Sequence, residues 1–301
     1  MDLKQLRCLI ACVETGSFSE AAKKLYTTQS SVSKLIKSLE DSLGILIFER
    51  MPRGIRLTAQ GKKIYHHACR IVSEADGLKA MARRGEAEWL RIAANPSSWF
   101  SDQFVDYYNE NEEKNYHFQI TTAGVRTVME RVRDYLDDMG FVYILGQQEV
   151  AFLYEIGKEH LVFEPLHETE IILYPGGSSL LQGKRDRINM KEAAGIRFIQ
   201  NYQDEFFDIE SLGTEDGDGW NGLDISVLTN SDYIMEKMLR KSDVANISGN
   251  YLSAGKGTAP GVALDIPDNR VIFGCIFRKG EKKSSGVEAL MEFLKSRIQG
   301  N

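Results

Sequence analysis

The chain has 301 residues, of which 43% are hydrophobic and 27% are charged. This composition excludes a wholly disordered protein and is sufficient for more than one packed domain. The longest apolar runs, such as residues 141–145, are far too short to cross a bilayer, so we expect no membrane segment. The N-terminus has no basic stretch followed by an apolar one, and the four cysteines have no zinc-like spacing. We therefore expect a cytoplasmic protein with free thiols, no bound metal and no cofactor.

Charge is distributed unevenly along the chain, although the formal net charge is only −6. Residues 1–85 contain 15 Lys and Arg against 8 Asp and Glu, whereas the remainder contains 22 against 35. A basic N-terminal part joined to an acidic body predicts that only the N-terminal part contacts phosphate. Chance segregation of charge is the alternative interpretation.

Three short helices are expected in the first 44 residues. Apolar residues at helical spacing predict the first of them: Leu3, Leu6, Leu9, Ile10 and Val13. That helix ends at Gly16, and Ser17 is the expected N-cap of a second helix at about residues 18–25, with Glu20 at capping-box spacing. A turn leads to a third helix at about residues 29–43, for which Gly44 is the expected left-handed C-cap.

A β-wing and a long helix are expected next. Two short strands at residues 45–49 and 55–58 flank a turn at residues 51–54, and basic residues mark this wing: Arg50, Arg53 and Arg56. Thr58 is the expected cap of a helix that reaches about residue 84. Apolar residues recur along that helix in steps of four and three: Ile64, Ala68, Ile71, Ala75 and Leu78. We expect these residues to form a dimerisation seam, and packing on the helix's own domain is the alternative.

From residue 89 onward, the pattern alternates between strands and helices. The expected strands are residues 90–94, 118–122, 140–145, 171–174, 197–200 and 224–228. The expected helices are residues 101–109, 125–135, 191–194, 231–241 and 287–298. Such alternation predicts an α/β sheet with parallel strands, so the fold class is α/β with a helix-rich head.

The second and third helices are spaced as a helix-turn-helix, in which the latter helix enters the major groove of DNA. Its expected contact residues are Thr28, Gln29, Ser30, Ser33, Lys34 and Lys37. Gln suits bidentate contact with adenine, Ser and Thr suit bases or phosphate, and Lys suits guanine or phosphate. We expect Arg50 and Arg53 of the wing to contact the same DNA along its backbone or in its minor groove.

The first 65 residues resemble the DNA-binding domain of LysR-type transcriptional regulators. Matching segments include Gly-Ser-Phe-Ser at 16–19, Ala-Ala at 21–22, Thr-Gln-Ser-Ser-Val-Ser at 28–33, Leu-Glu at 39–40, Leu-Gly at 43–44 and Leu-Thr at 57–58. Ser30 stands where proline is common in the family. The resemblance implies a winged helix-turn-helix at residues 1–58, a linker and dimerisation helix at 59–88, and a two-lobed effector-binding domain, similar to periplasmic binding proteins, at 89–301.

The same resemblance implies a regulator that binds double-stranded operator DNA as a homodimer or homotetramer and responds to a small-molecule effector. The two-lobed fold crosses between its lobes twice, and we expect the crossings near residues 164–165 and 265–267. Its ligand lies where strands end and helices begin, since free backbone N–H groups there attract an anion. The expected effector contacts are Ser97, Ser98, Trp99, Thr122, Gln147, Asn201 and Tyr202. We expect an anionic effector; for Ser97 and Ser98, a role as a helix cap is the alternative.

No arrangement of residues in the sequence supports catalysis, so we do not expect an enzyme. Residues 217–222 match G-x-G-x-x-G, but they follow an acidic loop and precede a strand, which is the wrong context for a dinucleotide site. Two other hypotheses are a ligand-binding protein whose head only assembles it and an enzyme built on the α/β body. The basic head argues against the first, and the missing catalytic arrangement argues against the second.

Overall fold

The computed structural model of the chain describes residues 1–52, 54–84, 88–176, 187–193, 195–202, 204–209, 212, 223–249 and 261–299. The chain forms two compact units, of which one comprises Met1–Ala87 with Asp134–Leu136 and the other Glu88–Arg133 with Asp137–Asn301. Each unit has a hydrophobic core of its own. Among the described residues, no helix is both long and apolar enough to cross a membrane.

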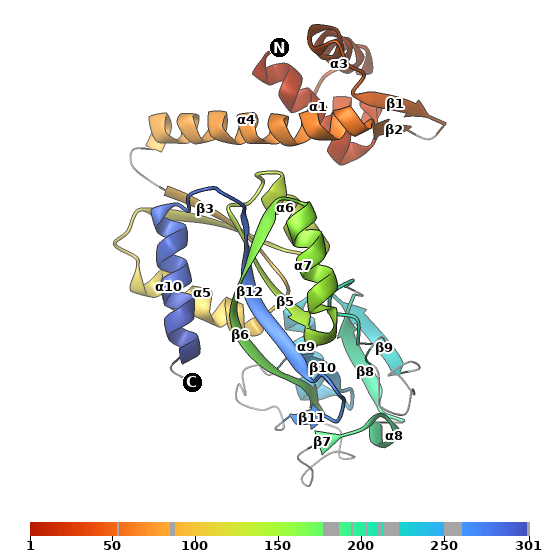
Figure 1. The fold of residues 1–301 in the computed structure, drawn as a ribbon, viewed down its shortest axis with the longest axis vertical. Coiled ribbons are helices and arrows are strands. Elements are labelled where there is room, and N and C mark those ends of the chain that lie inside the picture. Colours follow the sequence, from red (N-terminus) through yellow and green to blue (C-terminus); the bar gives the residue numbers. More distant parts are fainter. Residues whose placement is uncertain are drawn as a thin grey trace. The chain divides into compact units, whose positions relative to one another are not determined.

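Three helices open the N-terminal unit (Figure 1): α1 at Leu3–Thr15, α2 at Phe18–Lys24 and α3 at Gln29–Leu43. Gly16 and Gly44 end α1 and α3 in the left-handed conformation, with φ of 64° and 65°, as the sequence predicts. Ser17 and Thr28 begin α2 and α3, and their side chains accept hydrogen bonds from backbone N–H groups of the first turn. The helix boundaries are therefore determined by local capping groups.

A capping box forms at α1 instead of α2. Asp2 accepts a hydrogen bond from the backbone N–H of Gln5 at 2.8 Å, and Gln5 accepts one from the backbone N–H of Asp2 at 2.9 Å. The capping box predicted for Glu20 does not form, because the Glu20 carboxylate pairs with Lys23 at 2.8 Å. Ser17 therefore caps α2 alone.

The wing consists of two antiparallel strands, β1 at Phe48–Met51 and β2 at Gly54–Leu57. β1 begins later than predicted, because the Glu40 carboxylate accepts hydrogen bonds from the backbone N–H groups of Ile47 and Phe48. These bonds tie the chain before the wing to α3. Arg53, predicted on the wing, lies outside the described residues.

The long helix α4, at Ala59–Arg84, completes the core of the N-terminal unit. Thr58 caps it as predicted, because its hydroxyl oxygen accepts a hydrogen bond of 2.8 Å from the backbone N–H of Gly61. Buried residues from all four helices form this core, among them Leu6, Leu9, Ala21, Val32, Ile36, Leu39 and Val72. Burial of these side chains is the main favourable contribution to the fold of the unit.

The apolar stripe of α4 divides into two parts. Ala68 is only 1% exposed and lies in the core of the N-terminal unit, and Ile64 packs against that core. Ile71 and Leu78 are 40% and 68% exposed, and Ala75 is half-buried. The five residues therefore do not form a single free seam, since Ile64 and Ala68 stabilise their own unit.

The main sheet of the C-terminal unit is mixed and not all-parallel as predicted. Its strands are β3 at Glu88–Ala94, β4 at Tyr116–Thr122, β5 at Met139–Leu145, β6 at Leu161–Tyr174, β7 at Arg187–Ile188, β10 at Asn246–Gly249, β11 at Val262–Leu264 and β12 at Arg270–Arg278. Their order is β4-β3-β5-β12-β6-β11-β7, with β10 also paired to β6. β3 runs parallel to β4 and β5, whereas β12 runs antiparallel to both β5 and β6.

A second sheet and the helices complete this unit. The second sheet pairs β8 at Arg197–Asn201 in parallel with β9 at Asp224–Thr229. The helices are α5 at Ser98–Glu110, α6 at Val125–Arg133, α7 at Glu149–Lys158, α8 at Met190–Ala193, α9 at Asp232–Lys241 and α10 at Ser285–Gln299, with a 3₁₀ turn at Gly146–Gln148. The sequence pattern predicts most of the elements of this unit but misses α7, β7, β11 and β12.

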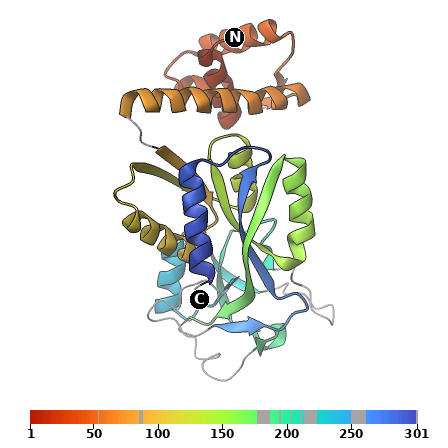
Figure 2. The ribbon, with the colours of Figure 1, turned by 60° about the vertical axis from the view of Figure 1, so that its left-hand side comes forward.

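Two long strands connect two lobes of the C-terminal unit (Figures 1 and 2). β6 and β12 pair side by side, from Leu161 with Arg278 to Glu170 with Arg270. The first lobe contains β3, β4, β5, α5, α6, α7 and α10, and the second contains β7 to β11 with α8 and α9. The expected crossing at residues 164–165 lies within β6, and the one at 265–267 lies between β11 and β12.

Candidate DNA interface and effector cleft

The N-terminus of α3 presents a cluster of hydroxyl groups. Thr28 Oγ1 accepts a hydrogen bond of 3.2 Å from the backbone N–H of Ser31, and it lies 3.0 Å from Ser30 Oγ and 2.8 Å from Ser31 Oγ. Thr28, Gln29 and Ser30 are exposed. The first turn of α3 therefore offers hydroxyls and an amide together with the partial positive charge of a helix N-terminus, a combination suited to phosphate and base edges.

The exposed face of α3 continues along the helix. Lys34 and Lys37 are exposed, and Ser33 is half-buried. The opposite face is buried in the core of the unit. The sequence-predicted residues of α3 thus share the face that points away from the core, which a recognition helix requires.

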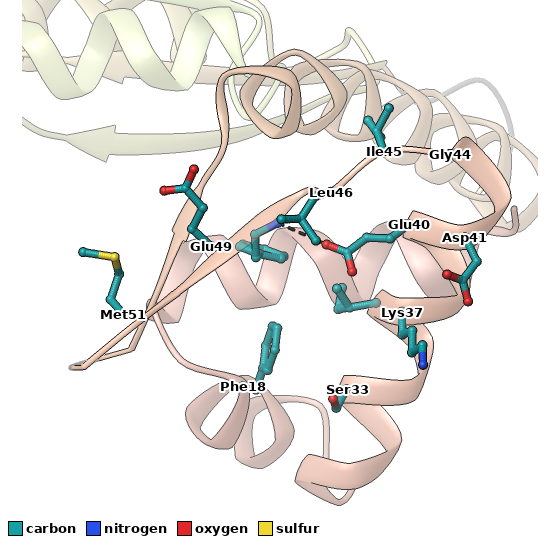
Figure 3. A pocket seen from close by; sticks show the side chains of 12 residues that line it. Phe18, Ser33, Lys37, Glu40, Asp41, Gly44, Ile45, Leu46, Glu49 and Met51 are labelled. Carbon is teal, nitrogen blue, oxygen red and sulfur yellow. Dashed lines mark hydrogen bonds between the residues drawn. The ribbon is translucent and has the colours of Figure 1, made fainter.

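A groove lies between α3 and the wing (Figure 3). Ser33 and Lys37 border it on the helix side, and Leu46 and Met51 border it on the side of the wing, as part of a lining around a volume of about 1070 Å³. Phe18 also lines it, and its ring packs edge-on against that of Phe48.

The groove is less basic than the helix face beside it. Three carboxylates contribute to its lining, from Glu40, Asp41 and Glu49. The Glu40 carboxylate is occupied by the backbone of the wing, as described above. Phosphate is therefore attracted to the lysines of α3 and repelled from the interior of the groove.

On the wing, Arg50 lies on β1 opposite Ile55, and Arg56 is exposed on β2. With Arg53 outside the described residues, these two positions are the basic residues that the structure places on the wing strands.

In the C-terminal unit, a cavity of about 310 Å³ lies between the two lobes. Side chains of the first lobe line one side of it, namely Asn95, Thr122, Thr127 and Tyr143. The other side is lined by Gln200, Asn201, Tyr202, Asp204, Phe207, Ile209 and Asn230. A smaller pocket of about 30 Å³ shares Pro96, Tyr143 and Asn201 with this cavity and reaches Ser97, Ser98 and Asp232.

Five of the seven predicted effector residues line these two spaces. Thr122, Asn201 and Tyr202 line the larger cavity, whereas Ser97 and Ser98 line the small pocket. The fold brings these five residues to the two spaces because strand ends and helix starts meet where the two lobes face each other.

Trp99 and Gln147 do not line either space. Trp99 is 6% exposed and its ring stacks on Phe141, with centroids 5.9 Å apart, in the core. It points there because α5 begins at Ser98, three residues earlier than predicted, so that Trp99 belongs to the helix face that packs on the sheet. Gln147 is exposed and its Nε2 donates to the backbone oxygen of Asp268 at 3.5 Å.

The two serines differ in their hydrogen bonds. Ser97 caps α5, since its Oγ accepts a hydrogen bond of 3.1 Å from the backbone N–H of Phe100. Ser98 Oγ is buried and makes no hydrogen bond within the described residues. The alternative role of a helix cap therefore applies to Ser97, and Ser98 retains a free hydroxyl beside the cleft.

Two carboxylates that the sequence analysis missed lie at the cleft. Asp204 accepts hydrogen bonds from the backbone N–H groups of Val125 at 2.5 Å and Phe206 at 3.1 Å, and burial raises its pKa above the usual value. Asp232 accepts a backbone hydrogen bond from Ser97, and burial raises its pKa to about 6. The contacts of Asp204 with Val125 and of Asp232 with Ser97 join residues that are remote in sequence, so no local pattern reveals them.

A network of neutral groups fixes the wall between the spaces. The Tyr143 hydroxyl donates to the backbone oxygen of Pro96 at 2.8 Å and accepts from Asn201 Nδ2 at 3.4 Å, and burial raises the pKa of Tyr143. Asn95 Nδ2 donates to the backbone oxygen of Ala123, and its Oδ1 accepts from the backbone N–H of Tyr143. Asn201 Oδ1, in contrast, is buried without a hydrogen-bond partner in the described part of the chain.

No group of three or more His, Cys, Asp or Glu side chains in the described ranges is placed to hold a metal ion. The four cysteines are buried and form no disulfide in the part of the chain that the structure describes.

Comparison with known proteins identifies relatives of the chain. A family model described as "Bacterial regulatory helix-turn-helix protein, lysR family" matches residues 3–62. The transcriptional regulator BudR of Klebsiella aerogenes is 32% identical over 123 residues, which are 40% of this chain and 86% of BudR. The regulator BenM of Acinetobacter baylyi is 30% identical over 145 residues, which are 47% of each protein. The chain thus spans about half the length of curated relatives such as BenM.

The same likeness extends to solved structures. Full-length CbnR, in a crystal structure with its target DNA, matches at a TM-score of 0.55 and 17% identity, over 98% of this chain and 99% of that chain. At this identity the match concerns the fold: a helix-turn-helix unit followed by a two-lobed α/β unit.

Proposed function

Because the chain belongs to the LysR family of bacterial helix-turn-helix regulators, we propose that it is a sequence-specific transcriptional regulator controlled by a small molecule. The observation that carries this proposal is the exposed polar face of α3, which begins at the hydroxyl cluster of Thr28 and continues through Gln29 and Lys34. We assign DNA binding to residues 1–58, dimerisation to residues 59–88, which include α4, and effector binding to residues 89–301. Operator binding to chromosomal DNA would take place in the cytoplasm.

The residues of α3 take distinct roles in this proposal. Gln29 and Ser33 contact base edges, because an amide pairs with adenine and a hydroxyl with either partner. Lys34 contacts a guanine or a phosphate, and Thr28 and Ser30 contact phosphate at the helix start. Lys37 contacts phosphate farther along the helix, and Arg50 and Arg53 contact the backbone or the minor groove. The structure of CbnR with its target DNA supports this assignment through its similar fold.

Assembly as a homodimer or homotetramer would hold two such heads on one operator. In α4, the candidates for the contact between protomers are Ile71, Ala75 and Leu78, since Ile64 and Ala68 are used by the core of their own unit. Exposed Ile71 and Leu78 are large apolar side chains on one helix, which favours a partner helix.

We place the effector in the cavity between the lobes. Its volume of about 310 Å³ lies at the lower end of the range for small-molecule sites, and Thr122, Asn201 and Tyr202 line it. A ligand that binds one lobe arrangement more tightly than another shifts the population of the regulator. The anionic effector expected from the sequence receives no support from the described lining, which contains no basic side chain.

The test is selection of DNA from a pool of randomised duplexes by the full-length protein. We expect enrichment of sequences with two half-sites related by dyad symmetry. Gln29→Ala should change the enriched half-site, whereas Glu14→Gln, on the α1 side of the unit, should leave it unchanged. If the selected duplexes share no common sequence, and the affinity of the protein for DNA depends only on the salt concentration, sequence-specific recognition is contradicted.

A further inference from the structure

The described lining of the cavity between the lobes is negatively charged. Among the described residues that line it, Asp204 carries the only ionisable carboxylate, and none of them is Lys, Arg or His. Asp232 lines the small pocket beside it. The nearby Arg126 pairs with Glu205 at 2.5 Å and is not part of the lining. An anion entering the cavity would therefore meet like charge, with no basic partner among the lining residues that the structure describes.

Two backbone N–H groups at the helix starts beside the cavity are already occupied by carboxylates. The first N–H group of α6, on Val125, donates to Asp204 at 2.5 Å. The N–H of Ser97, which precedes α5, donates to Asp232. The protein's own carboxylates thus take the positions at which a bound anion would neutralise these helix termini.

One hydrogen-bond acceptor in the described lining of the cavity, the amide oxygen of Asn201, has no donor. Asn201 Oδ1 is buried without a hydrogen-bond partner in the described part of the chain, although Asn201 Nδ2 is engaged by the Tyr143 hydroxyl. A buried acceptor without a donor is costly, and a ligand that supplies an N–H group removes that cost. The rings of Tyr143, Tyr202 and Phe207 also line the cavity, and aromatic faces attract cations.

We propose that the effector is a small aliphatic amine, whose ammonium group donates hydrogen bonds to Asp204 and to Asn201 Oδ1. The inference depends on the proposed function, in which this cavity is the effector site. An ammonium group has three donors and no acceptor, so it satisfies the carboxylate and the unpaired amide oxygen together. It also neutralises the charge of the cavity, which a carboxylate ligand would increase.

Calorimetry on the full-length protein tests the charge of the ligand. The probes are 1,4-diaminobutane, 1,4-butanediol and succinate, which share a four-carbon chain and end in ammonium, hydroxyl and carboxylate groups. We expect the diamine to bind at least about tenfold more tightly than the diol, since a hydrogen bond to a charged group is worth more than a neutral one. Equal or tighter binding of succinate, or no preference for the diamine, would overturn the proposal.

Two variants test the residues. Asp204→Asn should weaken the diamine about tenfold or more and leave the diol nearly unchanged, because only the charged contact is lost. Glu205→Gln is the matched control, as the neighbouring carboxylate pairs with Arg126 outside the lining, and it should bind the diamine like the wild type. Asn201→Ala removes the unpaired acceptor and should weaken the diamine several-fold even if Asp204→Asn does not fold.

Wild-type affinity for the diamine in both Asp204→Asn and Asn201→Ala would overturn the site. The DNA selection described above separates this failure from failure of the proposed function. A protein that selects an operator but does not prefer the diamine retains its function and excludes this ligand class. A protein that selects no operator fails at the proposed function itself.

Discussion

The carboxylate of Asp204 accepts a hydrogen bond of 2.5 Å from the backbone N–H of Val125, 79 residues away. Asp204 follows β8 of the second lobe, whereas Val125 begins α6 of the first lobe. Nearby, the backbone oxygen of Phe206 accepts from the backbone N–H of Leu145 at 3.0 Å. The segment after β8 thus joins the two lobes next to the cavity. A ligand that donates a hydrogen bond to Asp204 would bind the residue that joins the two lobes, so we expect its binding to favour one lobe arrangement over another.

Readout of DNA sequence is expected to depend on Gln29. Gln29→Ala should cost about 1–3 kcal/mol on the preferred operator and almost nothing on unrelated DNA, because it removes a base contact. Arg53→Ala, at a residue that the sequence predicts on the wing, should weaken binding to all DNA sequences alike and reduce the salt dependence of binding. Fluorescence anisotropy with operator and scrambled duplexes at several salt concentrations measures both effects. An equal loss on both duplexes for Gln29→Ala would show that α3 is not the recognition helix.

Assembly is expected to depend on the exposed part of the α4 stripe. Ile71→Asp places a charge at an apolar interface, which costs several kcal/mol unless the charge is paired. The variant should fold but sediment as a smaller species and lose tight operator binding. Ala68→Asp is the contrasting variant, since Ala68 is 1% exposed in the core and its replacement should unfold the N-terminal unit itself. Unchanged mass of Ile71→Asp in sedimentation would exclude this contact.

The sequence predicts the N-terminal unit well because its signals are local. Thr28 and Gly44 lie within a few residues of the groups they cap, so their roles in α3 can be recognised without the fold. β12 is missed because seven of its residues, 271–277, are buried in the middle of the sheet and show no polar alternation. Asp204 is missed because its partner Val125 is brought close only by the tertiary fold.

Among the predicted effector residues, those that follow from a general rule of the fold also differ from those that depend on tertiary detail. Thr122 and Asn201 are predicted from the general rule that ligands lie at strand ends. Trp99 lies in the core and not at the cleft, because α5 starts three residues earlier than the sequence pattern predicts. The expectation of an anionic ligand was based on the free N–H groups at helix starts. In the structure, Asp204 and Asp232 of the second lobe accept hydrogen bonds from two of these N–H groups, and the sequence pattern does not reveal those contacts.

The two serines before and at the start of α5 are expected to differ in their effects. Ser97→Ala removes the side-chain cap of α5 and should lower the free energy of unfolding by about 0.5–2 kcal/mol. Ser98→Ala should leave stability nearly unchanged, because Ser98 Oγ makes no hydrogen bond within the described residues. Thermal unfolding of both variants, with operator binding as a check on the head, gives the comparison. A larger loss for Ser98→Ala than for Ser97→Ala would contradict this assignment of the cap.

Stability between pH 4 and pH 6 is expected to depend on Asp232. Burial raises the pKa of Asp232 to about 6 from an ordinary value of 3.8, so the folded chain holds this proton more tightly than the unfolded chain. As pH rises through this window, the unfolded chain binds fewer protons than the folded one, and the free energy of unfolding falls. Above about pH 6 both states are ionised and the decline ends. Each pKa unit by which the folded chain exceeds the unfolded chain lowers the free energy of unfolding at neutral pH by about 1.4 kcal/mol. Because the Asp232 side chain is partly exposed, we expect a total decrease of about 1–3 kcal/mol.

Asp232→Asn removes this titration and keeps an oxygen that accepts from the Ser97 N–H. The variant should match the wild type near pH 4 and unfold at a higher temperature than the wild type above pH 6, with the gap opening between these values. Asp224→Asn is the matched control, because Asp224 is exposed on β9, and it should show no such gap. The measurement is thermal unfolding of the full-length chain from pH 4 to pH 8. A gap that is constant across this range would mean that the carboxylate of Asp232 ionises alike in the folded and unfolded chain, and its burial between the lobes would then carry no electrostatic cost.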